Sequence, residues 1–451
     1  MWWSIIGCGI VATDRCETDA DCVAAFGWGH TCGDRGSCDV LEPGEGCASA
    51  WPADVWSDRD RWRDAVVFGA IIDSGPFAIE RDAVRLAVDQ VNDLGGIDGL
   101  PVAVIECDPI DATGAERAPA IAAMAARLSG PTGARAIVGP IASSDAGTAA
   151  AAAVDAILVS PGASAISLAE GAGAPVWRTV PSDADLAQAV VRDLIDEGLG
   201  ATVVVHARDT GQTELAEALH QFAADAAGEY AGLSADPLAF ASATERDARI
   251  VEAAYAGADA VVLLSEDPND YVQMLLAASA IPEYEQLVVF VGPAAYRPSL
   301  LTDAAAASAL FPNLRGVRSA TREGAVADVF RASFASAYDG ADSDRGPYAG
   351  QAYDSAWSVF SAVLWSGMRY GAVTTDGLTE GLGGVSFGLP LALGPSGWSD
   401  LAVQFGSART VDLDGASSPL DFEAATRAIR GPVAIWNVED GQFVTIREYA
   451  F

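Results

Sequence analysis

Hydroxyl-bearing residues follow two neighbouring strand candidates of the chain. The candidate at 136–138 is followed by Ser143 and Ser144 at the start of a predicted helix, and the candidate at 157–159 is followed by Ser164. Serines at such junctions cap helices, and the free N–H groups of a helix start also hold anions. Ligands of open α/β sheets bind beyond the carboxyl ends of the strands, so this sheet edge is the first candidate for a ligand site.

Residues that could perform catalysis are sparse. The sequence has no Lys, which excludes Schiff-base chemistry and a phosphate-loop lysine, and it has no GxGxxG, GxSxG or HExxH motif. His206 ends a strand candidate and is the one histidine expected near a cleft, although a structural role fits it as well. We therefore predict that the protein is not an enzyme and needs no cofactor or metal. A hydrolase that depends on His206 is the alternative.

The composition excludes several classes of partner. The 451 residues include 62 acidic residues and 26 basic residues, and the formal charge is -36. Every one of the basic residues is Arg. Duplex nucleic acids and anionic membrane surfaces both require a basic footprint, so we expect neither as a partner. Hydrophobic residues make up 51% of the chain, enough for a sizeable core, and no apolar run has the length of about 18 residues that a spanning helix requires.

The cysteines are concentrated near the amino terminus. Residues 1–60 form a Cys-rich segment with almost no helical or strand periodicity, too poor in apolar residues to fold without cross-links. No CxxC pair occurs, so disulfides are preferred over a zinc site, for which His30 would be a further ligand. We expect Cys47 to pair with Cys107, which would tether this segment to the main body.

Cys8 forms a separate case. The sequence Ile5-Ile6-Gly7-Cys8 has the form of a lipobox, which predicts a lipidated cysteine and a membrane anchor. A chance tetrapeptide is the alternative, because residues 1–4 are too short for the apolar region of a signal peptide unless the true start lies upstream. With Cys8 lipidated, the other six cysteines form three disulfides, and the protein lies outside the cytoplasm.

From about residue 64 the chain alternates between short strands and amphipathic helices. Strands rich in Val, Ile and Leu between such helices are typical of parallel sheets covered on both faces. The pattern begins afresh near residues 178–183, which predicts two doubly wound α/β lobes. The predicted strands are 65–72, 102–106, 136–138, 157–159, 202–205, 260–264 and 287–291, and the predicted helices are 78–94, 112–128, 144–154, 184–197, 214–226, 251–256 and 270–278.

Several motifs follow one another in a characteristic order and spacing. They are Ile72-Asp73-Ser74-Gly75-Pro76, Val91-Asn92-Asp93-Leu94-Gly95-Gly96-Ile97-Asp98-Gly99, Ile137-Val138-Gly139-Pro140 with Ser143, Ser160-Pro161-Gly162-Ala163-Ser164, Arg178-Thr179-Val180-Pro181-Ser182-Asp183 and Ala352-Tyr353-Asp354. Together they resemble type I periplasmic binding proteins, and in particular the branched-chain amino-acid (Leu/Ile/Val) binding proteins of ABC transporters. The resemblance implies two Rossmann-like lobes joined by three hinge crossovers, near 178–182, 316–321 and 416–420. Lobe 1 would comprise 61–179 and 320–417, and lobe 2 would comprise 180–319 and 418–451.

The resemblance also implies a ligand site. Ser143 and Ser164 would hold the α-carboxylate of the ligand, with help from the backbone at Gly162. Thr210 and Glu266 would contribute from the opposite lobe.

Tyr348 falls where the family uses an aromatic ring, although a core position would suit it equally. The chain departs from the family at Ala294, where the amino-acid binders have an acid for the ligand's ammonium group. Either Glu266 or Asp73 replaces that acid, or the ligand is not a standard α-amino acid. A solvated charge at the strand end is the alternative role for Glu266.

Together these features predict an extracytoplasmic, periplasmic solute-binding protein. We expect a monomer that captures an amino acid or a related small carboxylate and delivers it to the permease of an ABC importer. A ligand-sensing receptor module of the same fold is the alternative within this class.

Overall fold

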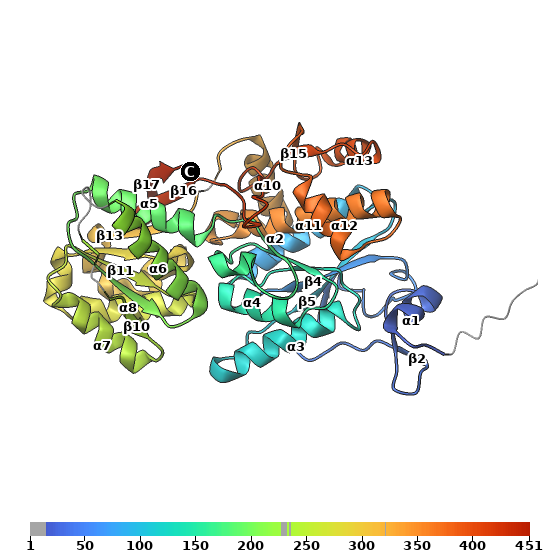
Figure 1. Cartoon of the computed structure of the whole chain (residues 1–451), viewed down its shortest axis with the longest axis horizontal. Helices are drawn as coiled ribbons and strands as arrows, with labels where there is room; N and C mark the ends of the chain where they lie inside the picture. The colour runs from blue at the N-terminus through green and yellow to red at the C-terminus, as the bar shows by residue number, and fades with distance from the viewer. Residues whose placement is uncertain (1–14, 227–231, 234–235, 321) are drawn as a thin grey trace, which may run out of the picture.

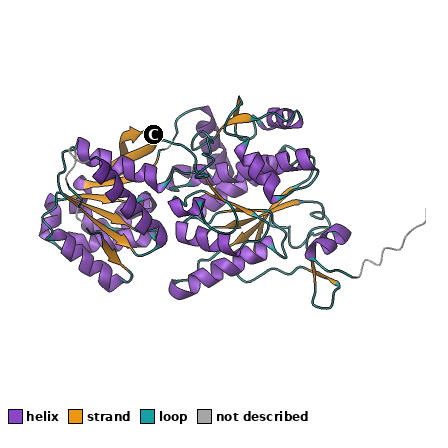
Figure 2. Ribbon diagram, in the orientation of Figure 1, coloured by secondary structure: helices purple, strands orange, loops and turns teal. Residues whose placement is uncertain are grey.

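The protein comprises two α/β lobes and a small amino-terminal module (Figure 1). The computed structural model describes residues 15–226, 232–233, 236–320 and 322–451, so Cys8 and its lipobox lie outside the described residues. Lobe 1 lies beside the module, and lobe 2 forms the opposite end of the molecule (Figure 1). Both lobes have strands sandwiched between helices (Figure 2), as predicted for doubly wound folds.

Lobe 1 is built on a six-stranded sheet of order β3-β5-β4-β6-β7-β8. Its strands from β4 to β8 are parallel, whereas β3, which comes from the Cys-rich segment, pairs antiparallel with β5. Every residue of β5 is buried, as expected for a parallel strand covered on both faces. The strands are β3 (Ser49–Trp51), β4 (Val66–Ile71), β5 (Val102–Cys107), β6 (Ala136–Val138), β7 (Ile157–Ser160) and β8 (Val176–Arg178).

Helices cover both faces of this sheet. One face packs against α2 (Ala78–Asp93) and the long α11 (Ala349–Tyr370), and the other against α3 (Arg117–Ser129) and α4 (Ser143–Ala152). Around α11 lie α10 (Ala325–Ala337), α12 (Thr375–Gly383), α13 (Trp398–Gly406) and the parallel pair β14 (Leu389–Ala392) and β15 (Val411–Asp414). No helix in the described part of the chain is long and apolar enough to cross a membrane.

Lobe 2 has a seven-stranded sheet of order β10-β9-β11-β12-β13-β16-β17, in which β16 runs antiparallel to both of its neighbours, β13 and β17. Helices α5 (Asp183–Asp196) and α6 (Thr210–Asp225) cover one face, and α7 (Ala243–Ala254) and α8 (Pro268–Ser279) the other, with the short α9 (Pro298–Asp303) nearby. The strands are β9 (Thr202–Ala207), β10 (Leu238–Phe240), β11 (Ala260–Leu264), β12 (Val288–Val291), β13 (Leu314–Ser319), β16 (Val433–Glu439) and β17 (Gln442–Tyr449).

Three chain segments connect the lobes. The first leads from β8 to α5, and the second leads from β13 to α10. We propose that the third lies later than the predicted 416–420, because Leu420, Phe422 and Ile429 are still buried in the core of lobe 1. The Arg178 amide also donates to the Arg427 carbonyl (2.8 Å), and the chain enters the lobe 2 sheet only at β16. We propose to place the third boundary near residue 432.

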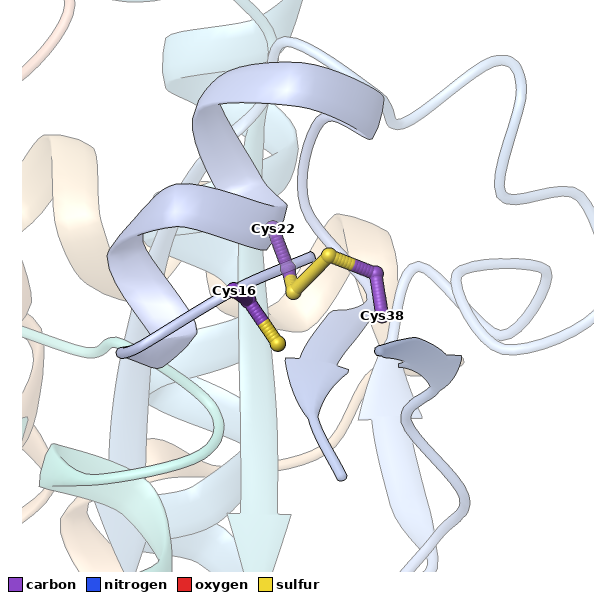
Figure 3. Close-up of side chains that lie close together, drawn as sticks. All are labelled: Cys16, Cys22 and Cys38. Carbon is purple, nitrogen blue, oxygen red and sulfur yellow. A yellow bond between two sulfur atoms is a disulfide. The ribbon is translucent and has the colours of Figure 1, made fainter. Parts of the chain in front are cut away.

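The amino-terminal module contains α1 (Asp19–Phe26), β1 (His30–Cys32) and β2 (Cys38–Val40). Disulfides join Cys16 to Cys32 and Cys22 to Cys38, and the predicted Cys47–Cys107 disulfide tethers the module to β5. The sulfur atoms of Cys16, Cys22 and Cys38 lie within 4.8 Å of one another. Figure 3 shows these three side chains together, with the bond between Cys22 and Cys38. A disulfide sulfur is not the thiolate that zinc requires, so the structure favours the disulfide interpretation of these cysteines.

Candidate functional site

The carboxyl ends of strands from both lobes meet at a small cavity. Strands β6 and β7 lead into α4 and the loop at 161–165, while β9 and β11 lead into α6 and Glu266. A cavity of about 30 Å³ lies between them, and we call it the inner cavity. Five of the six residues predicted from the sequence line it, namely Ser143, Gly162, Ser164, Glu266 and Tyr348, together with Phe77, Gln212 and Ala294.

Ser143 is hydrogen-bonded to the loop at 161–165, which was expected to bind the ligand together with it. Its Oγ accepts hydrogen bonds from the amides of Ser164 (3.1 Å) and Ala165 (3.2 Å). The buried Arg178 side chain donates to the Ser164 carbonyl and also to the Thr426 carbonyl, near the third connection between the lobes. These contacts fix the carboxyl edge of the lobe 1 sheet and leave the hydroxyl proton of Ser143 to be donated.

Glu266 reaches from lobe 2 to the start of α4 in lobe 1. Its Oε1 accepts from the Ser143 amide (2.7 Å), and its Oε2 accepts from the Ser144 hydroxyl (2.6 Å) and amide (3.3 Å). The N-cap residue of α4 is Ala142, which offers no side-chain acceptor, so Glu266 caps this helix from the other lobe. The positive end of the helix dipole favours the carboxylate at this position.

Two further carboxyl groups surround Glu266. Burial raises the pKa of Glu266, an effect that its hydrogen bonds from Ser144 and Ser143 oppose. Burial, together with the nearby Glu266 charge, raises the pKa of Asp209 to about 7. Burial also raises the pKa of Asp183 to about 7, against the effect of the neighbouring Ser164 hydroxyl. The cleft is therefore a region in which additional negative charge is costly.

The structure separates Thr210 from the other predicted site residues. Thr210 is exposed at the start of α6, whereas Gln212, two residues later, is 7% exposed and lines the inner cavity. Asp209 caps α6 by accepting a hydrogen bond from the Gln212 amide (2.8 Å). The sequence interpretation missed Gln212, because the Asp209 N-cap marks the start of α6 but does not place the Gln212 side chain in the cavity.

Aromatic rings form one wall of the inner cavity. Tyr348 is 7% exposed, and its ring centroid lies 6.2 Å from that of Phe77. The Tyr348 amide donates to Glu80 Oε1 (3.0 Å), and Glu80 is fully buried. Burial raises the pKa of Glu80 to about 7.

A larger outer cavity of about 580 Å³ adjoins the inner one, and the two share Phe77, Ala142, Ser265 and Glu266 in their walls. Asp73 and Arg117 of lobe 1 line the outer cavity opposite Arg297 of lobe 2. Its volume lies within the range of about 300–1,000 Å³ that is typical of small-molecule sites.

His206, the histidine expected near the cleft, is buried apart from both cavities. His206 is 5% exposed, its Nδ1 lies 2.8 Å from the Ala207 carbonyl oxygen, and burial lowers its pKa. His206 is not among the described residues that line the inner or the outer cavity, and neither lining contains a cysteine or a histidine. The inner cavity instead presents hydroxyl groups, an amide, a carboxylate and two aromatic rings.

Solved structures similar to this chain include amino-acid-binding proteins and solute-binding proteins of ABC transporters. LivJ of Streptococcus pneumoniae, described in complex with isoleucine, is 17% identical, with a TM-score of 0.66 over 86% of this chain and 99% of LivJ. The leucine-binding protein LivK of Thermotoga maritima is 15% identical, with a TM-score of 0.65 over 85% of this chain and 99% of its own.

A solute-binding protein of Rhodopseudomonas palustris, in complex with 4-hydroxybenzoate, is 16% identical, with a TM-score of 0.65 over 86% of this chain and 97% of its own. At such identities the similarity shows a common fold. No curated protein sequence matches the chain. The sequence profile of a family described as periplasmic binding protein matches residues 69–406, which is most of the chain. The chain therefore belongs to the periplasmic binding protein family.

Proposed function

We propose that the protein captures a small polar ligand between its two lobes and delivers it to an ABC importer outside the cytoplasm. The observation that carries this proposal is the inner cavity, whose walls come from the carboxyl ends of both sheets. A cleft bounded by two lobes and three connections closes and opens by a hinge motion. Such a site holds and releases a ligand without altering it.

The proposed ligand contacts come from both sides of the cleft. Ser143, Gly162, Ser164 and Tyr348 face the cavity from lobe 1, and Glu266 faces it from lobe 2. Gln212 joins this set, whereas Thr210 stands at the exposed start of α6. Thr210 lines neither the inner nor the outer cavity.

The ligand class follows from the site and its relatives. The similar proteins are described with isoleucine, leucine and benzoates, which are small compounds that carry a carboxylate. We propose an amino acid or a related small polar compound, accommodated across the inner and outer cavities.

Three disulfides support a location outside the cytoplasm, because such bonds persist in oxidising compartments. Lipidation of Cys8 remains a prediction that intact-mass measurement of the membrane-associated protein would test. We further propose that the protein acts as a monomer and that an importer permease receives the ligand.

Thermal-shift screening against amino acids, amines, short peptides and small carboxylates tests the function. A ligand present at about a hundred times its dissociation constant adds about 2.7 kcal/mol of stability, which shifts the unfolding midpoint measurably. Mass spectrometry of the released compound should return its original mass. Failure of the whole library, or release of an altered compound, would contradict the proposal.

A further inference from the structure

The place at which a bound carboxylate was expected is occupied by a carboxylate of the protein. The amides of Ser143 and Ser144 and the Ser144 hydroxyl all donate to Glu266. A ligand carboxylate at the start of α4 would have to compete for the same donors. It would also lie close to the Glu266 charge in a largely dehydrated cleft, where like charges repel strongly.

The inner cavity offers acceptors to a ligand and no cationic side chain. Among its lining residues, Glu266 is the one acid, and there is no Arg. Gln212 also lines this cavity and is only 7% exposed. Its Oε1 has no hydrogen-bond partner in the described part of the protein. A buried acceptor of this kind requires a donor, because leaving it unpaired costs free energy.

The remaining walls suit a cation as well. Phe77 and Tyr348 present two tilted rings, and ring faces attract ammonium groups within about 6 Å of the centroid. The volume of about 30 Å³ accommodates a group of the size of a water molecule or an ammonium group. A carboxylate with its two oxygens would fill the space less favourably beside Glu266.

The outer cavity has the same electrostatic character. Six acidic residues line it, against two arginines. Arg117 is already paired with Asp73 (3.2 Å) and Asp145 (2.8 Å). The net negative lining of this entrance attracts cations and repels anions. The acidic residues are Asp73, Asp145, Asp209, Glu266, Asp267 and Asp270.

Resting on the proposed function, we propose that the inner cavity binds the ammonium group of the ligand, with Glu266 and the Gln212 amide oxygen as its acceptors and Phe77 and Tyr348 as its aromatic wall. The carbon skeleton of the ligand and any carboxylate then lie in the outer cavity. The ligand class is thus an amine or an amino acid bound amine-first, with its orientation opposite to the carboxylate-first arrangement expected from the sequence.

Matched probe pairs test this orientation on the full-length purified protein. Each pair shares a carbon skeleton and differs in charge: leucinamide and isocaproate, benzylamine and benzoate, butylamine and butyrate. Titration calorimetry should give amines at least about tenfold tighter binding than their carboxylate partners. Equal or tighter binding of the carboxylates would overturn the proposal while leaving the proposed function intact. If no amine binds, the proposal also fails, and if no compound of the wider library binds, the proposed function fails with it.

Substitutions identify the acceptors. Glu266→Gln keeps an oxygen for the Ser143 amide but removes the charge, and it should weaken amine binding at least about tenfold. Glu214→Gln is the matched control, because Glu214 also accepts a backbone hydrogen bond across the lobes, from Ser167 (2.9 Å), but lines neither cavity. It should leave amine affinity within about threefold of the wild type.

Gln212→Leu provides a second variant that leaves the hydrogen bonds of Glu266 in place, and it should also weaken amine binding. Unchanged amine affinity in both Glu266→Gln and Gln212→Leu would overturn the proposal. Tighter carboxylate binding by Glu266→Gln would likewise overturn it. That result would mean that ligand carboxylates displace Glu266 from the donors of Ser143 and Ser144 and bind there themselves.

Discussion

Helices α4 and α6 begin at the same cleft from opposite lobes, but they are capped differently. Helix α6 is capped by its own preceding residue, since Asp209 accepts from the Gln212 amide. Helix α4 follows Ala142 and receives its cap from Glu266, more than a hundred residues away on the other lobe. The cap of α6 is thus independent of the lobe arrangement, whereas the cap of α4 forms only when the lobes are together. The difference links the start of α4 to the closure of the cleft.

The largest expected effect comes from Gly211, at the start of α6, which lies close to Ser143 at the start of α4. A Cβ at this position would lie 2.6 Å from Glu266 Oε1 and 2.9 Å from Ser143 Cβ. Gly211→Val should therefore hold the lobes apart and weaken ligand binding about a hundredfold or more, because affinity falls with the fraction of closed protein. Calorimetry measures the affinity, and small-angle scattering measures the separation of the lobes.

Gly147→Ala is the control for that variant. Gly147 lies within α4, and a Cβ there would meet only Leu168 Cδ2 at 3.7 Å. The control should retain ligand binding and stabilise the helix by up to about 1 kcal/mol. Retained binding by Gly211→Val would show that the contact between the two helix starts is not needed for ligand capture.

Substitution of Glu80 tests the effect of a buried carboxyl group next to Tyr348, which lines the inner cavity from lobe 1. The Glu80 pKa of about 7 exceeds the usual value of 4.5, so the folded protein holds more protons than the unfolded chain between these pH values. Stability therefore falls as pH rises through this window, and Glu80→Gln should relieve the loss. We expect the variant to be more stable by about 1–3 kcal/mol at pH 8, with a smaller gain near pH 5.

Urea unfolding of Glu80→Gln and the wild type at both pH values measures this gain. Because Gln retains an oxygen for the Tyr348 amide, the hydrogen bond at this position is conserved in the comparison. A gain that does not increase with pH would contradict a buried, ionised Glu80.

Substitution of Asp209 tests the cap that α6 receives from its own preceding residue. At pH 5, below the raised pKa of Asp209, the carboxyl is neutral and still offers an acceptor oxygen. Asp209→Ala should then lower the free energy of unfolding by about 1 kcal/mol, with or without ligand, because an N-cap acceptor is lost within one lobe. Glu217→Ala removes an exposed acid from the same helix and should stay within about 0.5 kcal/mol of the wild type. Denaturant titration distinguishes the two. Equal effects of both substitutions would argue that Asp209 is not a stabilising cap.

Ala142 offers the smallest and most specific test. Its φ of -72° and ψ of 140° are suited to an N-cap residue, so Ala142→Ser should give α4 a cap of its own. The expected gain in unfolding free energy is about 0.5–1 kcal/mol. We also expect the variant to depend less on Glu266 for stability, which a double-mutant cycle with Glu266→Gln measures. Strict additivity in that cycle would mean that the two caps do not compete.

The residue pattern predicted the layered fold because local periodicity determines it. Strand β11 occupies the predicted 260–264, and the predicted Cys47–Cys107 pair is present. Helix α7 begins at Ala243 rather than at 251, because its first turns are polar and its start is marked by the Ser242 cap instead of by apolar spacing. The start of a helix can be predicted from apolar spacing only where the apolar pattern extends to that start.

The candidate site was predictable only in part. Ser143, Gly162 and Ser164 follow strands of one sheet, so sequence order alone brings them to one edge. The contact of Glu266 with Ser143 and Ser144 depends on how two lobes meet, which local sequence does not encode. Gln212 was missed for the same reason, because its side chain becomes a cavity wall only across the lobe interface.

Hydrogen–deuterium exchange with the tightest compound from the ligand screen tests the central claim most directly, namely that the ligand lies between the lobes. The account predicts that ligand slows exchange in residues 139–148 and 160–167 of lobe 1 and in 209–216 and 262–268 of lobe 2. Protection confined to one lobe would contradict it.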